Sequence, residues 1–188
     1  MDRMSETTVL IVPGLREHVP DHWQTRLAEA LPRSRTVAPL EVDKLDCAAR
    51  VAAIESALAG IAGSVILVAH SAGVIMVAHW ARSSRHTGRI RGALLAAPAD
   101  LESPMPAGYP TVQTLDEHGW LPVPRVALPF TSIVAAGSND PLARLDRSRA
   151  LARDWGSRFV ELGAVGHLNP ASGHGEWPRA MEFVRELA

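Results

Sequence analysis

Three side chains that could together carry out acyl-transfer chemistry, Ser71, Asp140 and His167, each follow a segment that reads as a buried strand. A serine attacks a carbonyl carbon efficiently when a histidine removes its proton and a carboxylate orients that histidine. Parallel strands end at a common edge of their sheet, so side chains that follow different strands can meet there. The order serine, acid, histidine along the chain therefore predicts a triad of Ser71, Asp140 and His167.

The serine lies between two apolar segments. Residues 65–68 form a β-branched run suited to a buried strand, and residues 72–81 are apolar on every side, as in a buried helix. The junction Ala69-His70-Ser71-Ala72-Gly73 resembles the G-x-S-x-G turn that exposes a nucleophilic serine, with alanine in the place of the first glycine. Ser71 is the predicted nucleophile, although a serine at a helix start could also be only an N-cap.

The acid and the base follow the last two predicted strands. Asp140 precedes Pro141, a favoured first residue of a helix, so this aspartate could instead be an N-cap. His167 ends the glycine-rich run 163–167 and could be an exposed turn residue. Asp100, after the fourth predicted strand, is a second candidate for the acid because its loop opens at the same edge.

Strand and helix patterns alternate along the chain and predict parallel β-α-β units with right-handed crossovers. We expect one domain, residues 1–188, with a mostly parallel six-stranded sheet of order 2-1-3-4-5-6, helices on both faces and no separate cap domain. The predicted strands are 8–12, about 35–38, 65–68, 92–97, 132–136 and 159–162; the predicted helices are about 21–31, capped by Asp21, then 47–59, capped by Asp46, 72–81, about 141–155 and about 177–187. Residues 98–131 contain six prolines and should form an ordered surface loop with a short helix near 114–119.

Composition excludes several classes of protein. The net charge is −1 over 188 residues, whereas a nucleic-acid-binding domain typically carries an excess of positive charge. The single cysteine, Cys47, cannot form an intrachain disulfide, which favours a reducing compartment. Met1 to Thr8 lacks the layout of a signal peptide, and no apolar run approaches membrane-spanning length, so a cytoplasmic location without membrane association is expected. No dinucleotide or Walker motif is present, and His18 with His22 lacks further ligands, so neither a cofactor nor a metal is expected.

Several blocks of residues together resemble the retinoblastoma-binding-protein-9-like serine hydrolases, a compact α/β-hydrolase family without a separate lid domain. The resemblance covers nearly the whole chain. It is carried by Pro13-Gly14 and His22-Trp23-Gln24, by residues 69–73, by Ser138 to Pro141, and by Gly166 to Gly173 with Gly175 and Trp177. It implies an α/β-hydrolase fold and a triad of Ser71, Asp140 and His167, and leaves the substrate open.

The expected function is hydrolysis of a small carboxyl ester or related acyl substrate through a covalent acyl-enzyme, as in a carboxylesterase-like serine hydrolase. Backbone N–H groups of Leu15 and Ala72 are the expected oxyanion donors. Residues expected to line the pocket are Arg16, Glu17, His18, His22, Tyr109 and Trp120. One alternative is a protein-interaction module on a hydrolase fold whose triad is idle or slow, so a protein partner stays open. Another is a flavodoxin-like binding domain, for which the loop after the first strand is a poor phosphate cradle.

Overall fold

A computed structural model describes residues 6–188; the first five residues of the polar start discussed above lie outside this range. Six strands form one all-parallel sheet in the order β2-β1-β3-β4-β5-β6, which confirms the predicted order. The strands are β1 (Thr8–Val12), β2 (Ser34–Thr36), β3 (Val65–His70), β4 (Ile90–Ala96), β5 (Ser132–Ala136) and β6 (Arg158–Glu161). β1 and β3 lie side by side at the point where the strand order reverses, and this is where open α/β sheets bind ligands.

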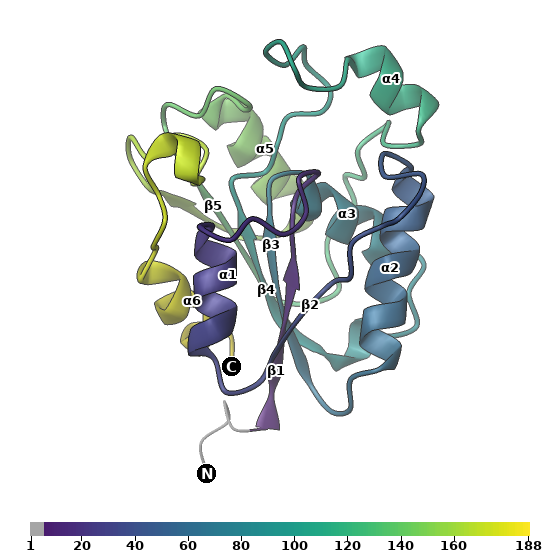
Figure 1. Ribbon diagram of the computed structural model, residues 1–188, viewed down its shortest axis with the longest axis vertical. Helices are drawn as coiled ribbons and strands as arrows, with labels where there is room; N and C mark the ends of the chain where they lie inside the picture. The colour runs from purple at the N-terminus through teal and green to yellow at the C-terminus, as the bar shows by residue number, and fades with distance from the viewer. Residues whose placement is uncertain (1–5) are drawn as a thin grey trace.

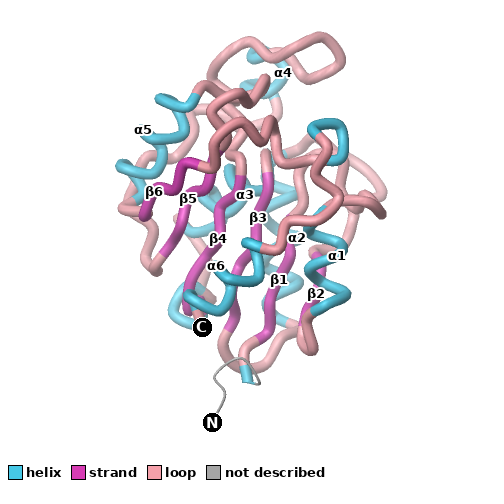
Figure 2. Tube along the Cα trace, turned by 90° about the vertical axis from the view of Figure 1, so that its left-hand side faces the viewer, coloured by secondary structure: helices cyan, strands magenta, loops and turns pink. Residues whose placement is uncertain are grey.

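Helices cover both faces of the sheet because its central strands are apolar on both sides (Figures 1 and 2). The cluster that contains Val9 and Ile11 packs against α1 (Trp23–Ala30) and α6 (Arg179–Leu187). The cluster that contains Leu10 and Val12 packs against α2 (Cys47–Ala59), α3 (Ala72–Ala81) and α5 (Leu145–Trp155). Within residues 6–188, no helix has the length and apolar character needed to cross a membrane.

The predicted cap of the first helix and the predicted start of the helix after β5 are wrong. α1 begins at Trp23, and its cap is His22 rather than Asp21, because the His22 Nδ1 atom accepts a hydrogen bond from the Gln24 N–H. α5 begins at Leu145 rather than near Pro141, because the preceding residues form a turn in which Asp140 Oδ1 accepts a hydrogen bond from the Leu142 N–H. Asp140 therefore does not cap α5, and its other carboxylate oxygen is available to a partner outside the turn.

The proline-rich segment between β4 and β5 is held to the body of the protein. Its one α-helix, α4 (Val112–Glu117), lies above the carboxyl edge of the sheet in Figure 1. Trp120 is fully buried and donates a hydrogen bond from Nε1 to the Leu45 carbonyl, while Trp155 of α5 donates one to the Pro124 carbonyl. Arg125 of this segment also pairs with Asp154 of α5. The segment is thus an ordered wall beside the carboxyl edge.

Candidate active site

The turn between β3 and α3 places Ser71 in a strained backbone conformation. Ser71 has φ 58° and ψ −127°, a region that side-chain-bearing residues rarely adopt, at a cost of about 1–3 kcal/mol. The strain is tolerated because small residues surround the turn. A Cβ atom at Gly73 would overlap the Val12 carbonyl oxygen and lie 2.6 Å from that of Pro13, and one at Gly14 would lie 3.2 Å from Ser71 Cβ. Ser71 occupies the N-cap position of α3, but its side chain forms no capping hydrogen bond, so capping does not account for the serine hydroxyl.

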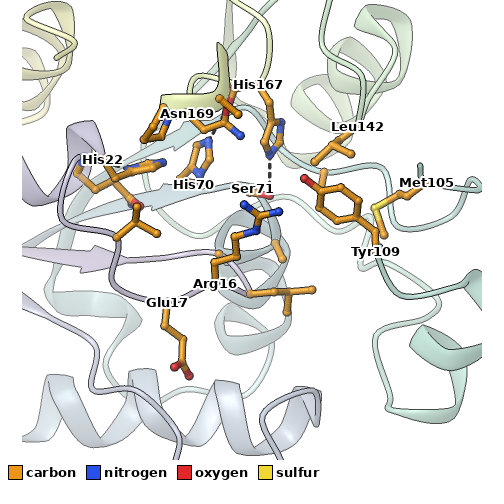
Figure 3. A pocket seen from close by; sticks show the side chains of 18 of the residues that line it. Arg16, Glu17, His22, His70, Ser71, Met105, Tyr109, Leu142, His167 and Asn169 are labelled. Carbon is orange, nitrogen blue, oxygen red and sulfur yellow. Dashed lines mark hydrogen bonds between the residues drawn. The ribbon is translucent and has the colours of Figure 1, made fainter. Parts of the chain in front are cut away.

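A chain of hydrogen bonds connects the three residues that the sequence singled out. His167 Nε2 lies 2.8 Å from Ser71 Oγ, and His167 Nδ1 lies 2.8 Å from Asp140 Oδ2 (Figure 3). The side chains of His167 and Asp140 are only 4% and 2% exposed, so water competes little for these contacts. His167 is therefore not an exposed turn residue. The arrangement can pass a proton from a serine hydroxyl to an imidazole whose other nitrogen is held by a carboxylate.

The second candidate acid, Asp100, is occupied elsewhere. Both of its carboxylate oxygens accept hydrogen bonds from Arg147, at 3.0 and 3.1 Å. Burial alone would raise the pKa of Asp100, but the Arg147 hydrogen bonds and charge lower it below its usual value. The structure brings Asp140, and not Asp100, into contact with His167.

Backbone contacts tie the Asp140 loop to the His167 loop. The Ser138 N–H donates to the Gly163 carbonyl, and Asn139 Oδ1 accepts from the Gly166 N–H at 2.7 Å. Gly137 permits this approach, because a Cβ atom there would lie 2.7 Å from the Gly166 carbonyl oxygen. Two short loops that are hydrogen-bonded to each other therefore set the distance between the Asp140 carboxylate and the His167 imidazole.

The His167 loop is also held from the other side of the sheet's carboxyl edge. His70 Nε2 donates a hydrogen bond to the His167 carbonyl at 2.8 Å, and Trp23 Nε1 donates one to the Leu168 carbonyl at 3.0 Å. The partner of His70 lies 97 residues further along the chain, so no local sequence pattern predicts this contact. Both donors are buried, so these contacts fix the backbone from which the His167 side chain projects.

Two further imidazoles form a cluster with His167: His70 packs beside His167, and His22 packs beside His70. The ring centroid of His70 lies 4.9 Å from that of His167 and 4.5 Å from that of His22. Burial, and secondarily the charge of His167, lower the pKa of His22 to about 4. Burial, followed by the charges of His167 and His22, lowers the pKa of His70 well below its ordinary value of 6.5. At neutral pH both neighbours are uncharged, so they do not repel a positive charge that forms on His167.

The low pKa of His22 predicts that the protein loses stability as the pH falls below about 6.5. The unfolded chain binds a proton near pH 6.5, whereas the folded chain resists it until about pH 4, so unfolding is favoured between these values. We expect His22→Asn, which retains a capping oxygen, to reduce the loss of unfolding free energy between about pH 7.5 and about pH 5.5 by about 1 kcal/mol. Urea titrations at the two pH values measure this loss. His18→Asn, at an exposed position, is the matched control, and an equal loss in wild type and His22→Asn would contradict the prediction.

The two backbone groups predicted as oxyanion donors lie at the same pocket as Ser71. Leu15 and Ala72 both line it. Neither the Leu15 N–H nor the Ala72 N–H has a hydrogen-bond acceptor within residues 6–188, so both are available to an added oxygen atom. Arg50 of α2, which no sequence motif singles out, is buried beneath this loop. Its guanidinium donates to the Leu15 carbonyl at 3.4 Å and lies 3.4 Å from Glu17 Oε1, which fixes the loop that carries the Leu15 N–H.

The pocket around Ser71 has a volume of about 150 Å³. Of the residues expected to line it, Arg16, Glu17, His22 and Tyr109 do so. His18 and Trp120 do not: Trp120 is buried against Leu45 in the core, and His18 lies outside this pocket. The apolar side chains of Leu101, Met105 and Leu142 also line the pocket and were not predicted to do so, because nothing in the sequence shows which side of a loop faces a pocket. Within the described residues, no group of three or more metal-ligating side chains is found.

Comparison with known proteins gives one family and many similar folds. The model of the serine hydrolase family matches residues 9–186. A YdeN-like protein from Pectobacterium atrosepticum superposes with a TM-score of 0.82 at 27% identity, over 97% of this chain and 91% of that one. A thermophilic esterase from Thermogutta terrifontis gives 0.62 at 18% identity (96% and 90% covered), and the type II thioesterase BorB from the borrelidin biosynthetic cluster gives 0.68 at 15% identity (97% and 93% covered).

A search of curated proteins finds no match. The similarities below 25% identity establish the fold alone, which is that of the α/β hydrolases. The family model, in contrast, spans all but a few residues of the chain and includes the elbow and both loops that surround His167. On this ground, the protein is a hydrolase that belongs to the serine hydrolase family.

Proposed function

We propose that the protein hydrolyses small carboxyl esters or related acyl substrates through a covalent acyl-enzyme. The observation that carries the proposal is the hydrogen-bond chain from Ser71 Oγ through His167 to Asp140, with both contacts at 2.8 Å. In this mechanism His167 Nε2 removes the hydroxyl proton as Ser71 attacks the acyl carbonyl. His167 Nδ1–H donates to Asp140, which orients the ring and stabilises its cation.

The remaining steps of the reaction use the same groups. The N–H groups of Leu15 and Ala72 bind the oxyanion of the tetrahedral intermediate. His167 then donates its proton to the leaving alcohol or thiol, and the acyl group stays on Ser71 Oγ. His167 then deprotonates a water molecule that attacks the acyl-enzyme, and it returns this proton to Ser71 Oγ as the bond to the acyl group breaks and the acid is released.

The size of the pocket supports a small substrate. A volume of about 150 Å³ accommodates a short acyl group rather than a long lipid chain. Structural neighbours are named as an esterase and as a thioesterase, so we include both alcohols and thiols as leaving groups of the proposed substrates. A reducing compartment such as the cytoplasm suits the buried free thiol of Cys47, whose pKa is raised to about 11 by burial and by Asp46.

Labelling with a fluorophosphonate probe tests the proposed nucleophile. We expect one adduct per folded molecule, on the peptide that contains Ser71, and no adduct in Ser71→Ala. Intact-mass and peptide mass spectrometry measure both. Ser138→Ala is the matched control, because Ser138 is an exposed serine on a neighbouring loop of the same edge, and its labelling should equal that of the wild type. A folded wild-type protein that does not react would contradict the proposal and favour an interaction module with an idle triad.

A further inference from the structure

The wall of the pocket at Ser71 carries two fixed charges, on Arg16 and Glu17. The charge of Glu17 is directed away from the pocket: its carboxylate accepts a hydrogen bond from the Leu40 N–H and pairs with Arg50 and Lys44. Figure 3 shows the Glu17 side chain pointing away from Ser71. The neighbouring imidazoles of His22 and His70 are neutral at pH 7, because burial lowers the pKa of each. The net charge that faces the pocket is therefore set by Arg16.

Arg16 has no carboxylate within ion-pair distance among residues 6–188. Its guanidinium carbon lies 5.9 Å from the centroid of the Tyr109 ring, across the pocket from the loop that carries Arg16. In Figure 3 the guanidinium points up toward Ser71, beside the Tyr109 ring. Other arginines differ: Arg50, Arg125 and Arg147 each pair with a carboxylate. Arg16 thus offers a free planar set of donors, suited to a carboxylate, at the mouth of the pocket.

The side of the pocket next to Tyr109 is apolar. Leu101, Met105 and Leu142 line it, and Figure 3 shows Met105 and Leu142 grouped on the side of Ser71 where Tyr109 lies. These side chains can pack against a short hydrocarbon segment of a substrate, but they cannot hydrogen-bond to a charged group or form an ion pair with it. A substrate that fits both features has a few apolar carbons at the reacting carbonyl and a negative charge near the solvent-exposed mouth.

We propose that Arg16 binds a carboxylate of the substrate, and that the enzyme prefers small acyl substrates carrying a carboxylate a few bonds from the scissile carbonyl. This inference rests on the proposed function, because it names the substrate class of the same site. The carboxylate can lie on the acyl side or on the alcohol side of the scissile bond, and Arg16 at the mouth of the pocket is compatible with either.

Two matched pairs of esters test the inference. 4-Nitrophenyl hexanoate and the 4-nitrophenyl monoester of adipate differ by a carboxylate at the acyl end. Methyl 4-acetoxybenzoate and 4-acetoxybenzoate differ by a carboxylate on the alcohol side. The quantity measured is kcat/KM for the anionic ester divided by that for its neutral partner, with the rate of Ser71→Ala subtracted as background. Comparing this ratio between enzyme variants cancels the intrinsic reactivity of each ester.

We expect the ratio to fall about tenfold in Arg16→Gln for at least one pair, mainly through KM, and to be partly restored in Arg16→Lys. Arg91→Gln removes the same charge from an exposed position at the other end of the sheet and should leave the ratio unchanged. An unchanged ratio in Arg16→Gln for both pairs, or an equal fall in Arg91→Gln, overturns the inference. The proposed function is tested separately by the neutral esters, whose hydrolysis should require Ser71. A failure of the proposed function can therefore be distinguished from a failure of the inference about Arg16.

Discussion

The His167→Ala variant is expected to hydrolyse a small ester about 10⁶-fold more slowly than the wild type, and Asp140→Asn about 10⁴-fold more slowly. Loss of the imidazole leaves Ser71 without a base. The asparagine substitution retains the oxygen that accepts from the Leu142 N–H, so the loop is preserved. It replaces the carboxylate oxygen that lies 2.8 Å from His167 Nδ1, and the imidazole is then no longer held in the productive tautomer.

The matched control for Asp140→Asn is Asp100→Asn. Asp100 is an aspartate at the same sheet edge, but its partner is Arg147. We expect Asp100→Asn to lower kcat less than threefold and to reduce the free energy of unfolding by about 1–3 kcal/mol, because it weakens a largely buried charged hydrogen bond. Steady-state kinetics and urea unfolding of both variants separate the two roles. If Asp100→Asn loses as much turnover as Asp140→Asn, the proposed acid is wrong.

Gly73→Ala is expected to disrupt both folding and catalysis, because the added methyl group meets backbone atoms rather than flexible side chains. It would overlap the Val12 carbonyl oxygen and approach the Pro13 carbonyl to 2.6 Å, so the end of β1 must move away from the start of α3. Overpacking of this kind costs about 1–3 kcal/mol or more. The displaced loop carries Leu15, and a shift of about 1 Å at a reacting centre lowers the rate by about 10²-fold.

Alanine substitutions at two other glycines provide comparisons for Gly73→Ala. A methyl group added at Gly88 would meet no other atom within 4 Å, and the backbone there has no left-handed φ angle, so Gly88→Ala should retain wild-type stability and turnover. Gly14→Ala meets Ser71 Cβ at 3.2 Å, a milder clash that should lower turnover more than stability. Thermal unfolding and ester hydrolysis of the three variants test the order. If Gly73→Ala has the stability and turnover of the wild type, the prediction is contradicted, because the structure leaves no space for a methyl group at this position.

Local signals in the sequence were sufficient for the fold. Apolar runs such as residues 8–12 and 132–136 match β1 and β5 to the residue, because a strand covered on both faces requires a continuous apolar stretch. Strict alternation with helices then allows few sheet orders, and the predicted one is confirmed. The same topology explains why loops after three different strands bring Ser71, Asp140 and His167 together.

The sequence alone determined which residues lie at the carboxyl edge, and only the tertiary structure decided which of them touch. A single residue can satisfy several local patterns. Asp140 precedes Pro141 and so matches the pattern of a helix N-cap, and only the tertiary packing shows that its carboxylate contacts His167 instead. Partners such as His70 and His167, or Arg50 and Leu15, are separated by 97 and 35 residues, and no local pattern encodes such a contact. Side-chain direction in the proline-rich segment is likewise a property of packing, which buries Trp120 and leaves Tyr109 at the pocket.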